Sequence, residues 1–269
     1  MTRQQLVENI FEKRSFLCVG LDSDPQLIPS QYHSFNDPVF EFNKAVIDAT
    51  QEHCVSYKLN IAFYECLGPA GWVTLEKTLE YIPESHFTIA DAKRGDIGNT
   101  ASKYAKTFFE YLHFDAVTVA PYMGRDSVLP FLEHTGKWVI VLGLTSNPGS
   151  ADFQYFRSAE GRFLYEEVIL KTAGWGTAEN TMFVAGATHP EELAIIRKLV
   201  PEHFLLVPGI GAQGGNLYDA VTHGRNNDLG LLVNSSRDII YRSGPGTHAQ
   251  AVAARAWEVK HEMEGFVKS

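Results

Sequence analysis

Charged side chains are concentrated between positions 91 and 96, where the sequence reads Asp91-Ala-Lys93-Arg-Gly-Asp96. Asp91 and Lys93 are two residues apart, so on a regular β-strand their side chains point to the same face. Lys58 lies in the preceding apolar run, which would be the neighbouring strand of a parallel sheet. Buried charges are costly unless they are paired, so lysines and carboxylates that meet here have to alternate in sign.

Several kinds of chemistry are compatible with such a cluster. A stabilising salt-bridge network uses the same residue types, and a lysine at this place could also form a Schiff base with a carbonyl substrate. Carboxylates on both sides keep a lysine protonated, which favours a proton donor over an amine nucleophile. Four charges at one end of a sheet favour catalysis over a purely structural network.

A second group of residues has the composition of a phosphate site. The glycine-rich segment 209–215 follows one apolar run, and Arg237 follows the next. Glycines let backbone N–H groups approach an anion closely, and a guanidinium can bind phosphate through two hydrogen bonds. A tight turn without a ligand would also be glycine-rich, but the arginine after the last run favours phosphate binding.

Single polar residues end other apolar runs. Asp22 could accept hydrogen bonds from sugar hydroxyls, or it could cap a turn. Ser146 and Asn147 could bind a polar heterocycle, or they could form the turn before Pro148. No group of His, Cys, Asp or Glu has the spacing of metal ligands, so we expect no metal.

Eight short apolar runs, rich in β-branched and aromatic residues, must position these side chains. They span 16–21, 54–60, 87–93, 115–121, 138–144, 182–188, 204–210 and 230–236. Continuous apolar runs are typical of parallel strands that are buried on both faces. The segments with helical spacing are 4–13, 99–114, 190–200 and 248–267.

Strand followed by helix, eight times over, predicts an α/β fold, a single-domain (β/α)8 TIM barrel over residues 1–269 with an N-terminal helix 4–13 before the first strand. A doubly wound open sheet is the alternative. Active sites of such barrels lie at the C-terminal ends of the strands, where the polar residues above occur. The non-periodic stretch 145–161 is long for a loop, and we expect it to act as a lid.

Composition limits the partners and the compartment. The chain has 269 residues and a formal net charge of −9, which disfavours a broad nucleic-acid surface but permits a small phosphorylated substrate. No apolar run is long enough to span a membrane, and the first residues do not resemble a signal peptide. The 3 cysteines show no CxxC or zinc spacing and cannot all pair with one another, so we expect a protein of the reducing cytoplasm.

The segment 91–100, Asp-Ala-Lys-Arg-Gly-Asp-Ile-Gly-Asn-Thr, resembles the orotidine 5′-phosphate decarboxylase family. The motif of that family is Asp-x-Lys-x-x-Asp-Ile-x-Asn-Thr, and every fixed position is present. Related phosphosugar barrels replace the Ile and the Asn-Thr pair. The resemblance covers the whole chain and is greatest to the longer bacterial subgroup, type 2. Arg237 departs from better-known members, because it follows two serines and not a glycine.

The resemblance implies conversion of orotidine 5′-phosphate to UMP and CO2, in de novo pyrimidine synthesis, without a metal or cofactor. Loss of CO2 leaves a carbanion at C6 that has no good electron sink, so the protein must supply electrostatic stabilisation and a proton. Lys93 would donate that proton. Lys58, Asp91 and Asp96 would complete a preorganised array around it.

The resemblance also implies substrate-binding residues and shared active sites. The substrate would contact Asp22, Thr100, Ser146, Gln213, Gly214, Gly215 and Arg237. Ser146 would bind the pyrimidine, Gln213 would link the base to the phosphate, and Arg237 would bind the phosphate. Asp96 and Thr100 would reach into the site of the neighbouring subunit, which implies a homodimer.

Three other functions are possible from these residues. A metal-dependent phosphosugar barrel, of the hexulose-phosphate synthase or epimerase type, would lose activity on chelation. A Schiff-base aldolase using Lys93 or Lys58 would be trapped by borohydride with a sugar phosphate. A non-catalytic nucleotide-binding barrel would have a broken charge array, whereas all four charges are present here.

Overall fold

The structure of the chain is a computed structural model that describes residues 1–186, 190–209 and 216–267. Its strands follow one another around a closed barrel in chain order. They are β1 (Leu17–Gly20), β2 (Ser56–Asn60), β3 (Phe87–Arg94), β4 (Ala116–Val119), β5 (Trp138–Leu144), β6 (Thr181–Ala185), β7 (Phe204–Pro208) and β8 (Leu231–Ser235). The closed sheet confirms the predicted barrel, and the alternative of an open sheet was wrong.

The helices alternate with the strands along the chain. The α-helices are α1 (Arg3–Lys13), α2 (Pro38–Thr50), α3 (Ile61–Glu65), α4 (Pro69–Tyr81), α5 (Gly98–Lys106), α6 (Arg125–Leu132), α7 (Leu164–Ala173), α8 (Pro190–Leu199), α9 (Leu217–Gly224), α10 (Arg237–Ile240) and α11 (His248–Glu264). Short 3-10 helices are η1 (Ser30–Tyr32), η3 (Pro121–Met123) and η4 (Pro148–Asp152), and η2 (Thr107–Tyr111) is a π-helical turn. The predicted helix 99–114 is therefore α5 continued by a π-helical turn. None of the described helices is long and apolar enough to cross a membrane.

Local signals explain where several helices begin. Asp37 accepts a hydrogen bond from the backbone N–H of Phe40, and Pro38 occupies the first helical position of α2. At the start of α11, the side chains of Thr247 and Gln250 each accept a hydrogen bond from the backbone of the other. This reciprocal cap satisfies two of the N–H groups that a helix leaves without partners.

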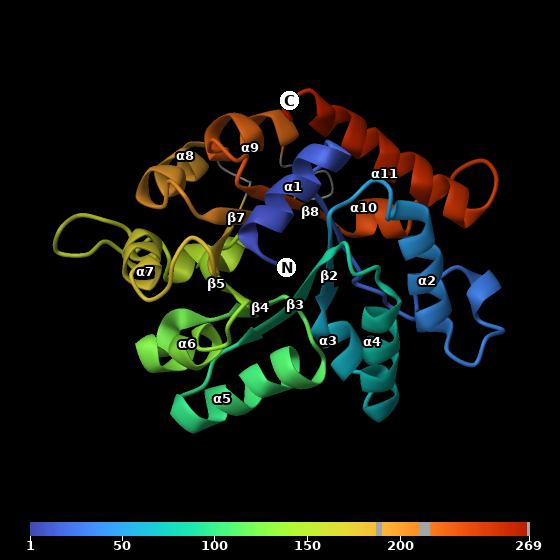
Figure 1. Ribbon diagram of the computed structural model, residues 1–269, viewed down its shortest axis with the longest axis horizontal. Coiled ribbons are helices and arrows are strands. Elements are labelled where there is room, and N and C mark those ends of the chain that lie inside the picture. The colour runs from blue at the N-terminus through green and yellow to red at the C-terminus, as the bar shows by residue number, and fades with distance from the viewer. Residues whose placement is uncertain (187–189, 210–215, 268–269) are drawn as a thin grey trace. The chain divides into compact units, whose positions relative to one another are not determined.

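The chain divides into two compact units, and the three boundaries between them fall inside α1, β3 and β8. One unit comprises Met1–Val7 and Lys93–Val233, and the other comprises Glu8–Ala92 and Asn234–Ser269. In the first unit, β4 to β7 pair in parallel, and α8 lies beside α9 (Figure 1). In the second, β1 to β3 pair in parallel, and α2 lies against α4 and α11.

Strand side chains on both faces form the core. Val139, Ile140 and Val141 are consecutive on β5 and fully buried, so both faces of that strand are covered. Burial of such a side chain contributes about 1.5–3 kcal/mol. This is the reason that the strands appear in the sequence as continuous apolar runs. Leu6 and Ile10 of α1 are also fully buried, as amphipathic spacing requires.

Candidate functional site

A buried lysine lies between two carboxylates at the C-terminal ends of the strands. Lys58 lies near the end of β2 and is 5% exposed. Its Nζ lies 2.9 Å from Oδ2 of Asp91 on β3 and 3.6 Å from Oδ1 of Asp22, just after β1. The parallel register of β2 and β3 places Asn60 opposite Asp91. The structure therefore brings together three of the residues that the sequence singled out.

The carboxylates determine the charge of this lysine. Burial lowers the pKa of Lys58, but the neighbouring Asp91 and Asp22 raise it by more, so the pKa lies above its usual value. A protonated lysine between two acidic side chains agrees with part of the expected alternation, and the places of Lys93 and Asp96 in it stay a prediction. Within the described residues, no three His, Cys, Asp or Glu side chains gather as a possible metal site. The absence of a metal and of a cofactor stays a prediction.

Polar residues of β8 lie next to β1 and were not assigned from the sequence. A Cβ on Gly20 would lie 1.9 Å from Oγ of Ser236, so only glycine leaves room for that hydroxyl. Asn234 donates from Nδ2 to the same Oγ at 3.2 Å. Its Oδ1 is buried and has no hydrogen-bond partner among the described residues. The signal was present in the sequence, because Asn234 is a polar residue that interrupts an apolar run.

The backbone at Lys93 is irregular. Its φ is 46°, which is the left-handed region that side chains other than glycine rarely adopt. The predicted strand is confirmed, because β3 runs through Asp91 and Lys93, but its backbone is not that of a regular strand at Lys93. The N–H of Lys93 donates to Oγ1 of Thr118 on β4 at 2.8 Å, and Thr118 is buried. Such a conformation costs about 1–3 kcal/mol and is concentrated at functional sites.

The residues after β3 lead into α5 and are partly or fully exposed. Oδ1 of Asp96 accepts a hydrogen bond from the N–H of Ile97 at 2.8 Å. Thr100 is exposed in the first turn of α5, and Ile97 is 57% exposed. Gly95 lies close to β4, because a Cβ there would be 3.0 Å from the carbonyl oxygen of Ala120. Thus the structure gives Asp96 and Thr100 surface positions on one short segment.

The long segment after β5 is ordered by its own hydrogen bonds. It contains η4 and an antiparallel bridge between Arg157 and Phe163, and α7 follows. Ser146 lies at its start and packs closely against Gly186, where a Cβ would be 3.1 Å from the backbone nitrogen of Ser146. Gln154 forms side-chain hydrogen bonds with Thr145, which precedes Ser146. No sequence pattern predicts this contact, and the action of the segment as a lid stays a prediction.

The predicted phosphate site is only partly described. Gln213, Gly214 and Gly215 lie outside the described residues. Arg237 is the first residue of α10 and is exposed. Its neighbour Asp238 pairs with Arg255 and with another arginine, whereas Arg237 forms no ion pair within the part of the chain that the structure describes. The guanidinium of Arg237 is thus accessible to an anion from solution.

A closed (β/α)8 barrel with a paired, buried lysine at its strand ends has the architecture of barrel enzymes, whose active sites lie at the C-terminal ends of the strands. A family model described as "Orotidine 5'-phosphate decarboxylase / HUMPS family" matches residues 15–252. The chain belongs to this family, as the motif at 91–100 predicted.

Full-length relatives narrow the assignment within the family. An orotidine 5′-phosphate decarboxylase of Bacteroides fragilis is 54% identical over an alignment of 272 residues, which covers 100% of this chain and 99% of the relative. One of Phocaeicola vulgatus is 55% identical over 267 residues, 98% of each chain. A solved structure of Leishmania donovani OMP decarboxylase is 35% identical, with a TM-score of 0.86 and coverage of 99% of each chain. This agreement over entire chains fits the longer subgroup.

Proposed function

We propose that this chain decarboxylates orotidine 5′-phosphate to UMP and CO2, with Lys93 as the proton donor and Lys58, Asp91 and Asp96 as its charged partners. The reaction is a carbon–carbon lyase step of UMP synthesis. The observation that carries the proposal is the ion-paired group of Asp22, Lys58 and Asp91, which occurs in a member of this family. The three free cysteines suit the reducing cytoplasm, where we propose that the enzyme acts.

The chemistry requires only fixed charges and one proton. The bond between C6 and the substrate carboxylate breaks, CO2 leaves, and the electron pair stays on C6. The ammonium of Lys93 gives a proton to C6, and the resulting amine regains one from water. Lys58 holds the carboxylate of Asp91 in place before the substrate arrives. Positive charge that is already oriented toward the developing carbanion needs no reorganisation during the reaction.

Binding of the substrate is assigned to the polar residues at the strand ends. Asp22 is proposed to bind the ribose hydroxyls, and its Oδ1 is buried without a hydrogen-bond partner among the described residues. Ser146 is proposed to bind the pyrimidine. Arg237 is proposed to bind the phosphate together with Gln213 and its two following glycines. Energy from phosphate binding would favour closure of the loops after β5 and β7.

Exposed apolar side chains support a homodimer with shared sites. Ile97, Tyr122 and Met123 are 57%, 91% and 45% exposed, and they follow the ends of β3 and β4. Met123 lies beside the segment after β3, because a Cβ on the glycine that precedes Asp96 would be 3.6 Å from its Cε. Exposed large apolar side chains often mark an interface when they form a patch. Asp96 and Thr100 belong to the same surface segment. We therefore propose that these two residues complete the active site of the partner subunit.

Turnover by chelator-treated protein tests the reaction. The ultraviolet absorbance of orotidine 5′-phosphate should fall as UMP forms, and a metal-dependent barrel enzyme would show no turnover. Lys93→Ala should lower kcat by at least about 10²–10⁴-fold, the usual contribution of a general acid, while UMP still binds. Lys103→Ala, on the exposed side of α5, is the matched control and should leave kcat unchanged. Normal turnover by Lys93→Ala would disprove the assignment.

Mixing of two inactive variants tests the shared site. A heterodimer of Lys93→Ala and Asp96→Ala contains one intact site if Asp96 acts across the interface. Random exchange of subunits should then restore about a quarter of the wild-type activity. No recovery after verified exchange would place Asp96 in the site of its own subunit, and an active Asp96→Ala variant before mixing would place it outside the site.

A further inference from the structure

The side-chain amide of Gln154 holds the residue just before Ser146 at two points. Its Oε1 accepts a hydrogen bond from the backbone N–H of Thr145 at 2.9 Å. Its Nε2 donates to Oγ1 of Thr145 at 2.8 Å. The same Thr145 hydroxyl donates to Oδ1 of Asn147 at 2.6 Å. The two neighbours of Ser146 are thus joined to each other and to Gln154 by one chain of hydrogen bonds.

Gln154 is itself fixed by the backbone around it. Its N–H donates to the carbonyl of Ser150 at 2.9 Å, and its carbonyl accepts from the N–H of Tyr165 at 3.1 Å. Ser150 belongs to η4 and Tyr165 to the first turn of α7. The position of the amide is therefore set by two elements of the fold. Glutamine is the side chain of this length that offers both an acceptor and a donor, as the two atoms of Thr145 require.

The opposite side of Ser146 is also confined. A Cβ at Gly186 would lie 3.1 to 3.2 Å from the N, Cα and Cβ atoms of Ser146. The N–H of Gly186 donates to the carbonyl of Leu144 at 2.9 Å, so the end of β6 cannot move away easily. Ser146 lies between this backbone and the residues that Gln154 holds. The side chain of Ser146 remains partly exposed, as a ligand contact needs.

We propose that Gln154 is a positioning residue: it fixes the turn 145–147 so that Ser146 is preorganised to bind the pyrimidine of the substrate. The inference rests on the proposed contact between Ser146 and the base. Gln154 does not touch the substrate in this scheme. Its effect is on the geometry of a group that does, and a displacement of about 1 Å in such a group can cost about 10²-fold in rate.

Comparison of two ligands separates the positioning of Ser146 from a general loss of order in the segment after β5. UMP contains the pyrimidine, whereas ribose 5-phosphate lacks it but keeps the sugar and the phosphate. Gln154→Ala should weaken binding of UMP about 10-fold or more, and leave the affinity for ribose 5-phosphate unchanged. Gln154→Glu keeps the acceptor but loses the donor, so its effect should be smaller in size and equally selective for UMP. Equal weakening of both ligands would overturn the inference.

A double-mutant cycle tests whether Gln154 acts through Ser146. If it does, Gln154→Ala combined with Ser146→Ala should have the kcat/KM of Ser146→Ala alone. If the losses of kcat/KM in the two single variants add in the double variant, the inference is overturned and the role of Ser146 is unaffected. A Gln154→Ala variant with wild-type kcat/KM would have the same meaning. A Ser146→Ala variant with wild-type kcat/KM would instead remove the proposed pyrimidine contact, and with it the basis of the inference.

Tyr155→Phe is the matched control in the same segment. The hydroxyl of Tyr155 donates to Oε1 of Glu192 on α8 at 2.5 Å, so the variant loosens the segment without touching the amide of Gln154. Its ratio of UMP to ribose 5-phosphate affinity should equal that of the wild type. If Tyr155→Phe reproduced the selective loss of UMP affinity, Gln154 would have no specific role. Thermal unfolding curves of each variant show whether it is folded at the temperature of the binding measurement.

Discussion

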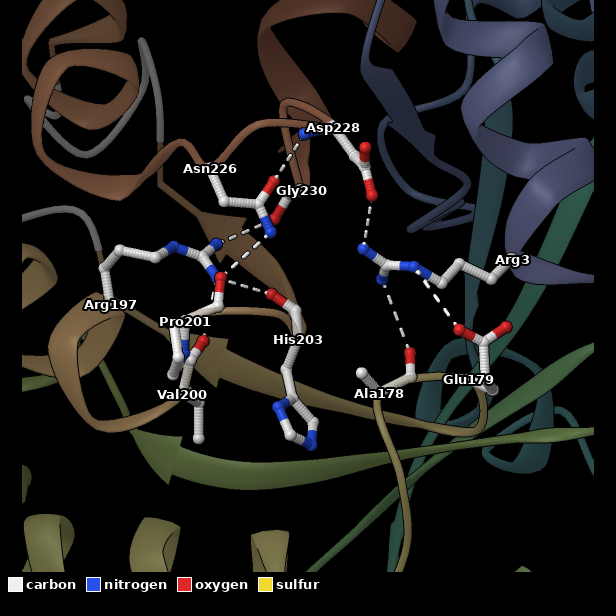
Figure 2. A network of polar contacts seen from close by, with 10 residues as sticks. All are labelled: Arg3, Ala178, Glu179, Arg197, Val200, Pro201, His203, Asn226, Asp228 and Gly230. Carbon is white, nitrogen blue, oxygen red and sulfur yellow. Dashed lines mark hydrogen bonds and ion pairs between the residues drawn. The ribbon is translucent and has the colours of Figure 1, made fainter.

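Two cations in this barrel are held in opposite ways. Lys58, at the C-terminal ends of the strands, pairs with the carboxylates of Asp22 and Asp91. Arg197, near the C-terminal end of α8, pairs with backbone carbonyls and with no carboxylate among the described residues (Figure 2). Neighbouring charges raise the pKa of Lys58 above its usual value in spite of burial. Burial lowers the pKa of Arg197 to about 10.

The carbonyls around Arg197 come from three short stretches of backbone. The guanidinium donates to the carbonyl oxygens of Gly224 at 2.7 Å, Val200 at 2.9 Å, Pro201 at 3.2 Å, His203 at 2.6 Å and Gly230 at 3.0 Å. One side chain thus satisfies acceptors that the ends of α8 and α9 leave without intrahelical partners. A nearby arginine, Arg3, instead pairs with Asp228 at 2.7 Å (Figure 2).

The difference indicates what each cation is for. Lys58 and the carboxylates around it are charges held in fixed places. They can interact electrostatically with a substrate that carries a carboxylate. Carbonyls around Arg197 supply no net charge, so the main role of the arginine is to join backbone segments through hydrogen bonds. We therefore expect loss of Lys58 to appear mainly in catalysis and loss of Arg197 mainly in stability.

Replacement of Lys58 by methionine should have the largest effect. The variant keeps the volume of the side chain but removes the cation that pairs with both carboxylates. We expect kcat/KM to fall about 10³-fold, which is typical when a preorganised charge is removed. Steady-state decarboxylation measures the loss, and circular dichroism shows whether the barrel persists. A folded Lys58→Met variant with near-normal kcat/KM would mean that this group is only structural.

Replacement of Arg197 by methionine should give the opposite result. Its carbonyl acceptors would lose the charged donor in a partly buried place, although those of Val200, Pro201 and Gly230 would keep a second donor. We expect the free energy of unfolding to fall by about 3 kcal/mol. Denaturant titration measures that change. The kcat of the folded variant at 25 °C should match the wild type. If kcat fell while stability stayed constant, the division between a catalytic and a structural cation would be incorrect.

The barrel and the Lys58 group could be predicted from the sequence because each produces a recognisable local pattern of residue types. Strands buried on both faces appear as apolar runs, and polar residues stand out where such runs end. Arg197 could not be recognised, because its partners are backbone carbonyls, which any residue type supplies. Lys93 is similar: its φ of 46° depends on tertiary contacts such as the hydrogen bond to Thr118, and nothing in a lysine predicts it.

His203 offers the smallest test, and it concerns the surroundings of Arg197. Burial, together with the charges of Arg197 and Arg3, lowers the pKa of the His203 ring to about 4. Neither ring nitrogen has a hydrogen-bond partner among the described residues. An unfolded histidine titrates near 6.5. Between pH 6.5 and 4 the unfolded chain therefore binds a proton that the folded chain does not, and stability falls as the pH falls.

His203→Leu removes this titration and keeps the backbone carbonyl that Arg197 binds. Above pH 6.5 the contribution of the neutral ring is fully present, so wild type and variant should then differ little. When the pH is lowered from above 6.5 to 5, the free energy of unfolding of the variant should fall by about 1 kcal/mol less than that of the wild type. This figure allows for solvent screening of the partly exposed ring. Unfolding curves at both pH values measure the difference. Parallel losses would mean that His203 is protonated in the folded protein, and that the positive charges of Arg197 and Arg3 do not dominate this part of the scaffold.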